Sequence, residues 1–543
     1  MRITTKIIQN NSLSNINTNK LLQDKLSQQM STEKKVNRPS DDPIVAIRAL
    51  RLRTNVNQVT QYYEKNVPDA ESWLEVTESA LSSMSEVVTD MIAQCTKGSN
   101  EDLTTSDRET ILTALKALRD EVYSTGNADY AGRFIFTGYR TDTPLTFTDA
   151  KKQEYTITEQ IDSSKIDKIT YVDSGKLLDI NESNYLDDGK DADGNATQNE
   201  KDFSDVVETA VSRSDIYRIR LSYKDIEAFA VDDKGGILGI ETYTKTVTEN
   251  GTTKIVFDDI TTNSNYSTTS IYDNPSPYET MSQDGNEDKI VLIKETGELL
   301  LGKNVYDKLM SLTDDPTTSF NEAEIRLNYK KTDWQNNDLK PEHYFACSSE
   351  GIDYNQAYLQ GISDEDKQTI EYDVGLNQRI RVNTTADEVF THDISRDVED
   401  MIKSMEDTVA MEKQVTKLKK MLEAEGDVGN RKVIETQLAA AEKAFTFLNE
   451  KTQQMFENGI TKMQKHLDAV NFAVTENGTR GQKLELISNR LMSQKTNFET
   501  LRSENEDIDI TDVAIKLSSA ELTYSSALMA TGKVLQNNLM NFI

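Results

Sequence analysis

Residues 70–95 read AESWLEVTESALSSMSEVVTDMIAQC, and this stretch decides the fold class. Its apolar and small residues recur at alternating steps of four and three, at Ala70, Leu74, Thr77, Leu81, Met84, Val88, Met91 and Cys95. Such a heptad stripe, held for more than three heptads, is typical of a helix in a coiled coil. A lone stripe buries nothing in water, so the pattern predicts partner helices elsewhere in the chain.

The same spacing returns on both sides of this stretch. After a break at Gly98, a second helix is predicted through Ile111, Leu115, Leu118 and Val122, with Thr105 or Ser106 as its cap. From about residue 391 the helical period resumes. One stripe runs through Ile434, Leu438, Ala441, Phe445, Leu448, Thr452 and Met455, and a second stripe follows a shift at Asn458-Gly459. The segment EAEGDVGN (423–430) predicts the turn of an additional helical hairpin.

Between about 141 and 390 the period is two, which indicates strands. KIVLIKETGELLLG predicts a hairpin that turns at Thr296-Gly297, and TIEYDVGLNQRIRV predicts another that turns near Gly375. The pentapeptides IRLSY (219–223) and IRLNY (325–329) are alike, which raises a duplicated β unit as one interpretation.

These changes of period predict an α+β fold. The N- and C-terminal segments form a long coiled-coil-like helical rod, and a β-rich outer region is inserted between them. The expected parts are an N-terminal inner helix (1–38), a helical rod (39–140), one or two β-rich outer domains (141–390), a returning rod with the extra hairpin (391–508) and a C-terminal inner helix (509–543).

A sharp corner is predicted near the N-terminus, in QMSTEKKVNRPSDDPIVAIRAL (29–50). One helix is expected to end near Val36. Pro43 suits the first position of the next helix because its φ is already helical and its missing N–H is not needed there. Asp42 is then the N-cap, and Ser40 and Asp41 complete the link, with both carboxylates near the positive end of the helix dipole.

Both terminal helices carry apolar residues close to the chain ends, where chains usually fray. The last helix is expected to begin near Thr511. A single pair of helices buries few such side chains, each contributing on the order of 2 kcal/mol, against about 1–2 kcal/mol of backbone entropy per ordered residue. Other chains are therefore expected to complete the pair. The predicted assembly interface consists of Leu13, Ile16, Leu22, Leu26, Leu517, Tyr524, Leu528, Leu535 and Phe542.

Composition excludes several classes of protein. The formal net charge of −31 argues against binding to nucleic acid or to an anionic membrane. No run approaches the roughly 18 apolar residues that a spanning helix needs, and the first 30 residues do not resemble a cleaved secretory signal. Two cysteines cannot form a disulfide framework.

A search for catalytic chemistry gives no active site. The three histidines, His343, His392 and His466, are far apart in sequence and none belongs to an HExxH motif. No phosphate-binding loop, dinucleotide fingerprint, nucleophile elbow or zinc-spaced cysteine pair occurs in the sequence. Cys95 lies on the heptad stripe and is interpreted as a small core residue. We therefore expect no enzyme activity, no cofactor and no metal.

Several segments resemble the flagellin superfamily. In order they are MRITTKIIQNN, QMSTEKKVNRPSDDPIVAIRAL, NADYAGRFIFTGYRTDTPLTF, QTIEYDVGLNQRIRVNTTADEVF, GQKLELISNRL and AELTYSSALMATGKVLQNNLMNFI, and the resemblance covers most of residues 1–140 and 365–543. Within the superfamily, the RPSDDP form and the MRIT start are more similar to the hook–filament junction proteins than to flagellin.

The resemblance implies a structural adaptor of the bacterial flagellum. Such a protein assembles as a ring of its own copies through coiled terminal helices, and its partners are other hook-associated proteins, the hook protein and flagellin. It also implies an extracellular location, export through the flagellar secretion apparatus without a cleaved signal, and an export chaperone bound at about Thr511 to Ile543. The alternative within the superfamily is flagellin, the filament subunit. An enzyme on a flagellin scaffold and a coiled-coil surface adhesin are the remaining hypotheses, and the missing HExxH motif counts against the first of these.

Overall fold

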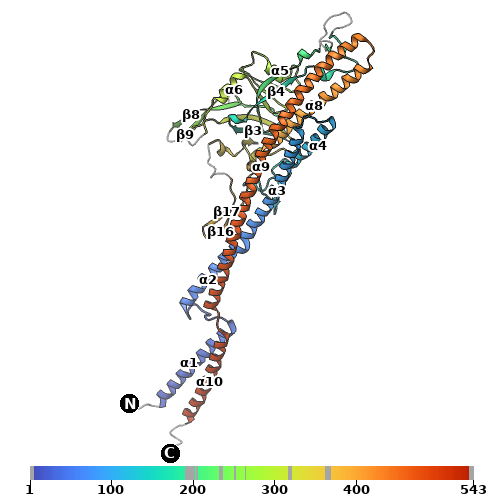
Figure 1. Ribbon diagram of the computed structural model, residues 1–543. Coiled ribbons are helices and arrows are strands. Elements are labelled where there is room, and N and C mark those ends of the chain that lie inside the picture. The colour runs from blue at the N-terminus through green and yellow to red at the C-terminus, as the bar shows by residue number, and fades with distance from the viewer. Residues whose placement is uncertain are drawn as a thin grey trace, which may run out of the picture. The chain divides into compact units, whose positions relative to one another are not determined.

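The computed structural model describes residues 5–189, 202–203, 206–231, 236–249, 252–262, 264–315, 321–360 and 368–536. The chain divides into two compact units, which are described separately here. We call Met1–Glu71, Glu371–Ile380 and Arg480–Ile543 the terminal unit, and Ser72–Ile370 with Arg381–Thr479 the central unit. Helices from both ends of the sequence and strands from its middle confirm the predicted α+β class (Figure 1).

The terminal unit is built on an antiparallel pair of helices, α1 (Thr5–Thr32) and α10 (Ile510–Gln536). Figure 1 shows them side by side, with both chain ends at the same end of the pair. Their shared core contains Leu26, Val513 and Ala520, and Met30 and Leu517 pack against it. Because this core is small, the pair buries little apolar surface of its own.

The corner after α1 is tighter than the sequence predicts. Helix α1 ends at Thr32 and not near Val36, because Glu33 adopts a left-handed φ of 57°. The backbone then pairs with the segment before α10, where the Ile508 amide donates to the Glu33 carbonyl at 3.1 Å and the Lys35 amide donates to the Glu506 carbonyl at 2.7 Å. Backbone groups that would have extended α1 are satisfied by this pairing instead.

The next helix begins as the proline spacing predicts. Helix α2 (Pro43–Gln61) has Pro43 at its start and Asp42 at its N-cap. The Asp42 carboxylate accepts the amides of Ile44 at 3.0 Å and Val45 at 3.1 Å. Asp41 has a different role, since its carboxylate accepts the Arg38 amide at 3.2 Å and holds the link.

Helix α2 continues into α3 (Val67–Gly98) through one π-helical segment, Tyr62–Asn66. Pro68 explains this segment, because its ring and missing N–H cannot be accommodated in regular α-helical hydrogen bonding. The hairpin of β16 (Glu371–Gly375) and β17 (Gln378–Arg381) lies against it. The Asn66 side chain donates to the Asp373 carbonyl at 2.7 Å. The predicted hairpin is confirmed, and its turn lies one to two residues beyond Gly375, where Asn377 has a φ of 56°.

In the central unit, the heptad stripe that decides the fold is buried. From Leu74 to Cys95 its described members are at most 4% exposed. Helix α4 (Thr105–Val122) packs on α8 (His392–Ala424), and Ile111, Leu115 and Val122 are buried. The predicted cap, Thr105 or Ser106, is wrong by one or two residues. Thr104 is the N-cap and forms a reciprocal capping box with Asp107, three positions later, whereas Thr105 has Arg108 at that spacing and cannot form one.

The predicted helical hairpin is present, with α8 turning into α9 (Val428–Glu506) after Ala424. Helix α9 is one helix of 79 residues and continues through Asn458-Gly459, where the sequence places a shift between two stripes. Its buried stripe also differs from the prediction, because Gln437, Ala444 and Phe456 are buried where Leu438, Phe445 and Met455 were expected. Near Gly459, helix α9 contacts both Met401 of α8 and Cys95 of α3. Contacts with two neighbouring helices therefore decide which of its positions are buried.

The described part of the central unit also holds two large sheets and a short two-stranded pair of β1 (Asp129–Tyr130) and β2 (Arg133–Phe134). The five-stranded sheet has the order β10-β11-β12-β5-β4. Its strands are β10 (Tyr266–Thr269), β11 (Ile290–Ile293), β12 (Glu298–Leu301), β5 (Ser212–Arg220) and β4 (Ile166–Asp173). Strands β11 and β12 pair in antiparallel register, which confirms the hairpin at Thr296-Gly297, whereas β10 and β11 are parallel.

The second sheet has eight strands in the order β15-β14-β3-β13-β6-β7, with β8 pairing with β13 and β9. Its strands are β15 (Ile352–Tyr354), β14 (Ala346–Ser349), β3 (Lys151–Ile161), β13 (Ile325–Trp334), β6 (Ala228–Val231), β7 (Ile237–Leu238), β8 (Ile240–Glu249) and β9 (Thr252–Asp259). IRLNY lies within β13, whereas IRLSY starts at the end of β5 in the other sheet and leaves it after Arg220. The two pentapeptides thus have different strand neighbours.

Candidate functional site

Large apolar side chains are exposed on the helices of the terminal unit, and we call this set the terminal apolar surface. Its members on α1 and α2 are Ile7, Ile8, Leu13, Leu21, Leu22, Ile44, Ile47 and Leu50. Its members on the end of α9 and on α10 are Leu486, Met492, Leu501, Ile510, Ile515, Leu522, Leu528 and Met529. The exposure of so many large apolar side chains on these helices makes the set a candidate binding face for another protein.

The predicted interface residues fall into two groups in the structure. Leu13, Leu22 and Leu528 are exposed and belong to the terminal apolar surface. Ile16 and Leu26 are buried within the chain, and Leu517 and Tyr524 are half-buried. The structure places Leu535 in α10 without describing its side chain, and Phe542 lies outside the described residues.

The most exposed members of this surface were missed by the sequence analysis. Leu21, Leu486, Leu522 and Met529 are 70–72% exposed. None of them was among the predicted interface residues, and the small core of the α1–α10 pair is formed by other side chains, Leu26, Val513 and Ala520. The signal that could have found them is an apolar residue on a face of the helix other than the one that pairs within the chain.

Charged and polar side chains join the N-terminal and C-terminal segments of the terminal unit near its corner. The Arg53 guanidinium makes two hydrogen bonds with the Glu506 carboxylate, Nε to Oε1 at 2.8 Å and Nη2 to Oε2 at 2.6 Å. Lys34 ion-pairs with Asp507, and its hydrogen bond and charge lower the pKa of that exposed carboxyl. The Asn505 side chain adds a hydrogen bond to the Val45 carbonyl at 3.1 Å. This set fixes the corner that supports α1 and α10.

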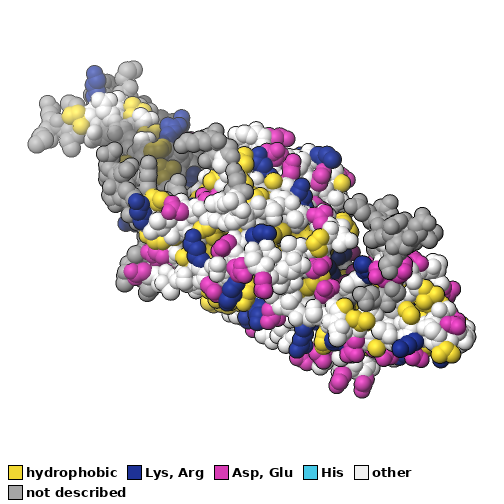
Figure 2. Space-filling view, turned by 90° about the horizontal axis from the view of Figure 1, so that it is seen from above, with side chains coloured by type: hydrophobic (Ala, Val, Ile, Leu, Met, Phe, Trp, Pro, Cys, Tyr) yellow, Lys and Arg dark blue, Asp and Glu magenta, His cyan; other side chains and the backbone are white. Residues whose placement is uncertain are grey.

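Elsewhere the surface is mixed. On the face seen in Figure 2, hydrophobic side chains are scattered among Lys, Arg, Asp and Glu side chains. Scattered single apolar residues are normal for a protein surface. No helix among the described residues combines the length and the apolar character that crossing a membrane requires.

The cysteine and histidine side chains were the candidates for catalytic groups, and each lies within the packing of the central unit. Cys95 and Cys347 are buried, and burial raises the pKa of each thiol to about 12, so neither is a thiolate near neutral pH. Burial also lowers the pKa of His343 and of His392 to about 3. His466 lies 3.4 Å from Asp397. Among the described residues no cluster of His, Cys, Asp and Glu has the arrangement of a metal site.

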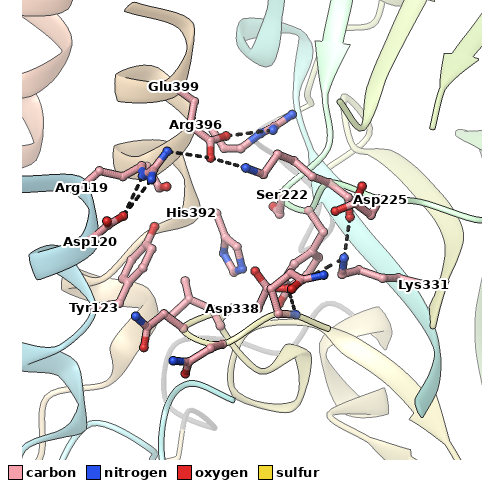
Figure 3. Close-up of a pocket in the computed structure, with 17 residues that line it drawn as sticks. Arg119, Asp120, Tyr123, Ser222, Asp225, Lys331, Asp338, His392, Arg396 and Glu399 are labelled. Atoms are coloured by element: carbon pink, nitrogen blue, oxygen red, sulfur yellow. Dashed lines mark hydrogen bonds and ion pairs between the residues drawn. The ribbon is translucent and has the colours of Figure 1, made fainter. Parts of the chain in front are cut away.

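A polar cavity of about 240 Å³ lies in the central unit beside α8 (Figure 3). Its charged side chains pair with each other: Glu399 accepts from Arg396 at 3.3 Å and lies 3.9 Å from Arg119, and Lys331 lies 3.8 Å from Asp338. A nucleophilic site needs a hydroxyl or thiol that is hydrogen-bonded to a base, and a third group that orients this base. The residues drawn in Figure 3 do not show this arrangement. This cavity is consistent with a structural role for its side chains.

Comparison with known proteins gives the family of the N-terminal part. Residues 3–141 match the family described as the bacterial flagellin N-terminal helical region. The chain is 32% identical over 170 residues to flagellar hook-associated protein 3 of Salmonella typhimurium, covering 30% of this chain and 53% of that protein. It is 30% identical over 203 residues to flagellar hook-associated protein 3 of Escherichia coli K12, covering 36% and 62%. The chain thus spans about half to three-fifths of the curated relatives that it matches.

Among solved structures, the flagellar junction protein FlgL from Legionella pneumophila aligns with 86% of this chain and all of its own, at 10% identity and a TM-score of 0.27. The sequence matches carry the assignment. This chain therefore contains a bacterial flagellin N-terminal helical region at residues 3–141 and is similar to flagellar hook-associated protein 3.

Proposed function

We propose that this protein is a structural adaptor that joins the hook of the bacterial flagellum to its filament. The observation that carries the proposal is the terminal apolar surface on α1 and α10, two helices that pair with each other and still expose leucines on their outer sides. The similarity to flagellar hook-associated protein 3 supports the same role.

The terminal apolar surface supplies the association energy in this proposal. Fully burying an exposed leucine contributes on the order of 2 kcal/mol, so a few such contacts on each copy suffice when many copies close a ring. The partners in this proposal are further copies of the chain, other hook-associated proteins, the hook protein and flagellin. The role needs no catalytic group, and we propose that the protein is not an enzyme.

The proposed location is extracellular, on the flagellum, after export through the flagellar secretion apparatus. An export chaperone is proposed to cover about Thr511 to Ile543, which contains the α10 part of the terminal apolar surface. Shielding of these side chains would prevent premature association. In the proposed division of labour, residues 1–38 and 509–543 form the inner core, 39–140 and 391–508 the rod, and 141–390 the outer domains.

A matched pair of variants tests the proposal. Leu528→Asp places a charge on α10 at a side chain that is 46% exposed, and Leu178→Asp places the same charge in the central unit at one that is 48% exposed. We expect Leu528→Asp to abolish filament attachment in a strain that carries it as its sole copy, and Leu178→Asp to leave attachment intact. Thermal melting should not distinguish the two isolated proteins. Equal attachment by both variants contradicts the proposed role of the surface.

The alternative is flagellin itself, because the matched N-terminal family is the flagellin one. Deletion of the gene separates the two. An adaptor mutant should build complete hooks and release filament subunits into the medium. A flagellin mutant should release none.

A further inference from the structure

A second cavity, of about 220 Å³, lies in the central unit, where β4, α8, α9 and α5 (Pro277–Ser282) meet. It is distinct from the terminal apolar surface and is independent of the proposed function. Its volume is below the 300–1,000 Å³ of sites for drug-sized ligands, so it suits a smaller molecule.

One side of the cavity is apolar and aromatic. Strand β4 contributes Ile169 and Tyr171, and α9 contributes Leu448 and Met455. The ring of Tyr171 stacks on Tyr278 of α5 with centroids 5.6 Å apart. This wall can receive an apolar side chain.

The deepest charged groups of the cavity are already satisfied. Arg218 of β5 ion-pairs with Glu298 and with Asp400, and the Tyr278 hydroxyl donates to Glu298. Burial raises the pKa of Asp400, but the Arg218 guanidinium outweighs this effect and lowers it to about 2. These groups form a fixed floor and are not free to bind a ligand charge.

Two other charged groups in the same cavity are not joined. Lys451 of α9 and Asp407 of α8 both line it, and neither forms a hydrogen bond or an ion pair within the described residues. Burial lowers the pKa of Lys451 and raises that of Asp407, while each partly stabilises the charge of the other. Both residues are half-buried and carry charges that no ion pair in the described structure compensates, so a molecule carrying the complementary charges can pair with both.

We propose that this cavity binds a free α-amino acid with an apolar side chain. The ligand carboxylate meets the Lys451 ammonium, the ligand ammonium meets the Asp407 carboxylate, and the side chain lies against Tyr171, Leu448 and Met455. Lys403 lies 5.5 Å from the centroid of the Tyr278 ring at the same cavity and adds positive charge beside the ligand carboxylate. Because α8, α9 and the five-stranded sheet all contact the ligand, binding stabilises their packing.

The test is calorimetric titration of the full chain with L-leucine and L-phenylalanine. N-acetyl-L-leucine lacks the ammonium and L-leucinamide lacks the carboxylate, so each analogue removes one proposed contact. We expect saturable binding of the free amino acids and binding roughly tenfold or more weaker for each analogue, about 1.4 kcal/mol per tenfold. We also expect the melting temperature to rise with amino-acid concentration.

Matched variants assign the binding to the cavity. Lys451→Met and Asp407→Asn should each weaken leucine binding by at least roughly tenfold. Lys420→Met and Glu423→Gln, which make the same changes at exposed positions of α8, should bind as the parent protein does. Since all four variants retain side-chain size, each is checked for a parental circular dichroism spectrum. Absence of binding by the parent, or equal binding by the cavity and surface variants, overturns the proposal.

Discussion

Arg53 and Glu506 are 453 positions apart in the sequence, and their side chains form a two-point ion pair. The Glu506 carboxylate is only 7% exposed, while Arg53 is largely open to water. Their contact therefore joins α2 to the last residue of α9, next to the corner from which α1 and α10 extend.

Removing this pair should loosen the corner. The pair should contribute about 0.5–1 kcal/mol of coupling energy, since solvent screens the exposed guanidinium. A double-mutant cycle with Arg53→Met and Glu506→Gln, followed by urea unfolding at low and high salt, measures it. We expect positive coupling that shrinks with salt. Strict additivity of the two substitutions would show that the corner does not rely on the pair.

The cap of α2 makes a separate contribution. Asp42→Ala leaves the Ile44 and Val45 amides without their acceptor and should cost about 1 kcal/mol. Asp42→Asn retains a side-chain oxygen and is the matched control, with a cost expected near zero. Amide exchange in the first turn of α2 gives the most local measurement. Faster exchange in both variants would mean that charge, and not hydrogen bonding, stabilises this end.

Gly459 should not tolerate a side chain. A Cβ at this position would lie 2.5 Å from Met401 Sδ and 3.6 Å from Cys95 Sγ, at the contact of α9 with α8 and α3. Gly459→Ala should therefore destabilise the central unit by about 1–3 kcal/mol. Gly478 is also in α9 and has no neighbour within 4 Å, so Gly478→Ala should stabilise by up to about 1 kcal/mol through helix propensity. Thermal unfolding compares them, and shifts of the same sign would refute the packing argument.

Stability should also depend on pH through Glu159. This carboxyl on β3 is buried, burial raises its pKa to about 7, and it accepts hydrogen bonds from Tyr329 and from the Ser222 amide at 2.9 Å. The folded state therefore holds this proton more tightly than the unfolded state, whose ordinary pKa is near 4.5. The stabilisation is complete below about pH 4.5 and is lost as pH rises to about 7, by an amount on the order of 3 kcal/mol.

The variant Glu159→Gln isolates this contribution, because glutamine does not titrate and its oxygen can still accept both hydrogen bonds. Urea unfolding of the variant should lose the fall in stability between about pH 4.5 and 7 that the parent shows. Identical pH profiles for the two proteins would assign the dependence to other groups.

The elements that were predictable from the sequence depend on short-range chemistry. The stripe from Leu74 to Cys95, the hairpin at Thr296-Gly297 and the Asp42 cap each follow from residues within a few positions of each other. The order of the strands was not predictable. Strand β3 pairs with β13 about 170 positions away, for example at Ile157 and Tyr329, and no local pattern encodes that choice.

The candidate site was predictable in part for a related reason. A heptad stripe identifies the side of a helix that needs a partner, but it does not say whether the partner is in the same chain. Leu26 is buried against α10, whereas Leu22 of the same helix and Leu522 of α10 are exposed. Intramolecular pairing buries only part of the apolar residues of these helices, so the surface left for other molecules is formed by those that stay exposed, Leu13 and Leu22 among them.

The central claim is that α1 and α10 form a pair that other molecules must complete. Hydrogen exchange of Thr5–Thr32 and Ile510–Gln536, in the isolated chain and in purified hook–filament assemblies, tests it directly. We predict fast exchange in the isolated chain, because only a small core holds the pair, and strong protection after assembly. Equal and strong protection of both helices in the isolated chain would contradict the claim.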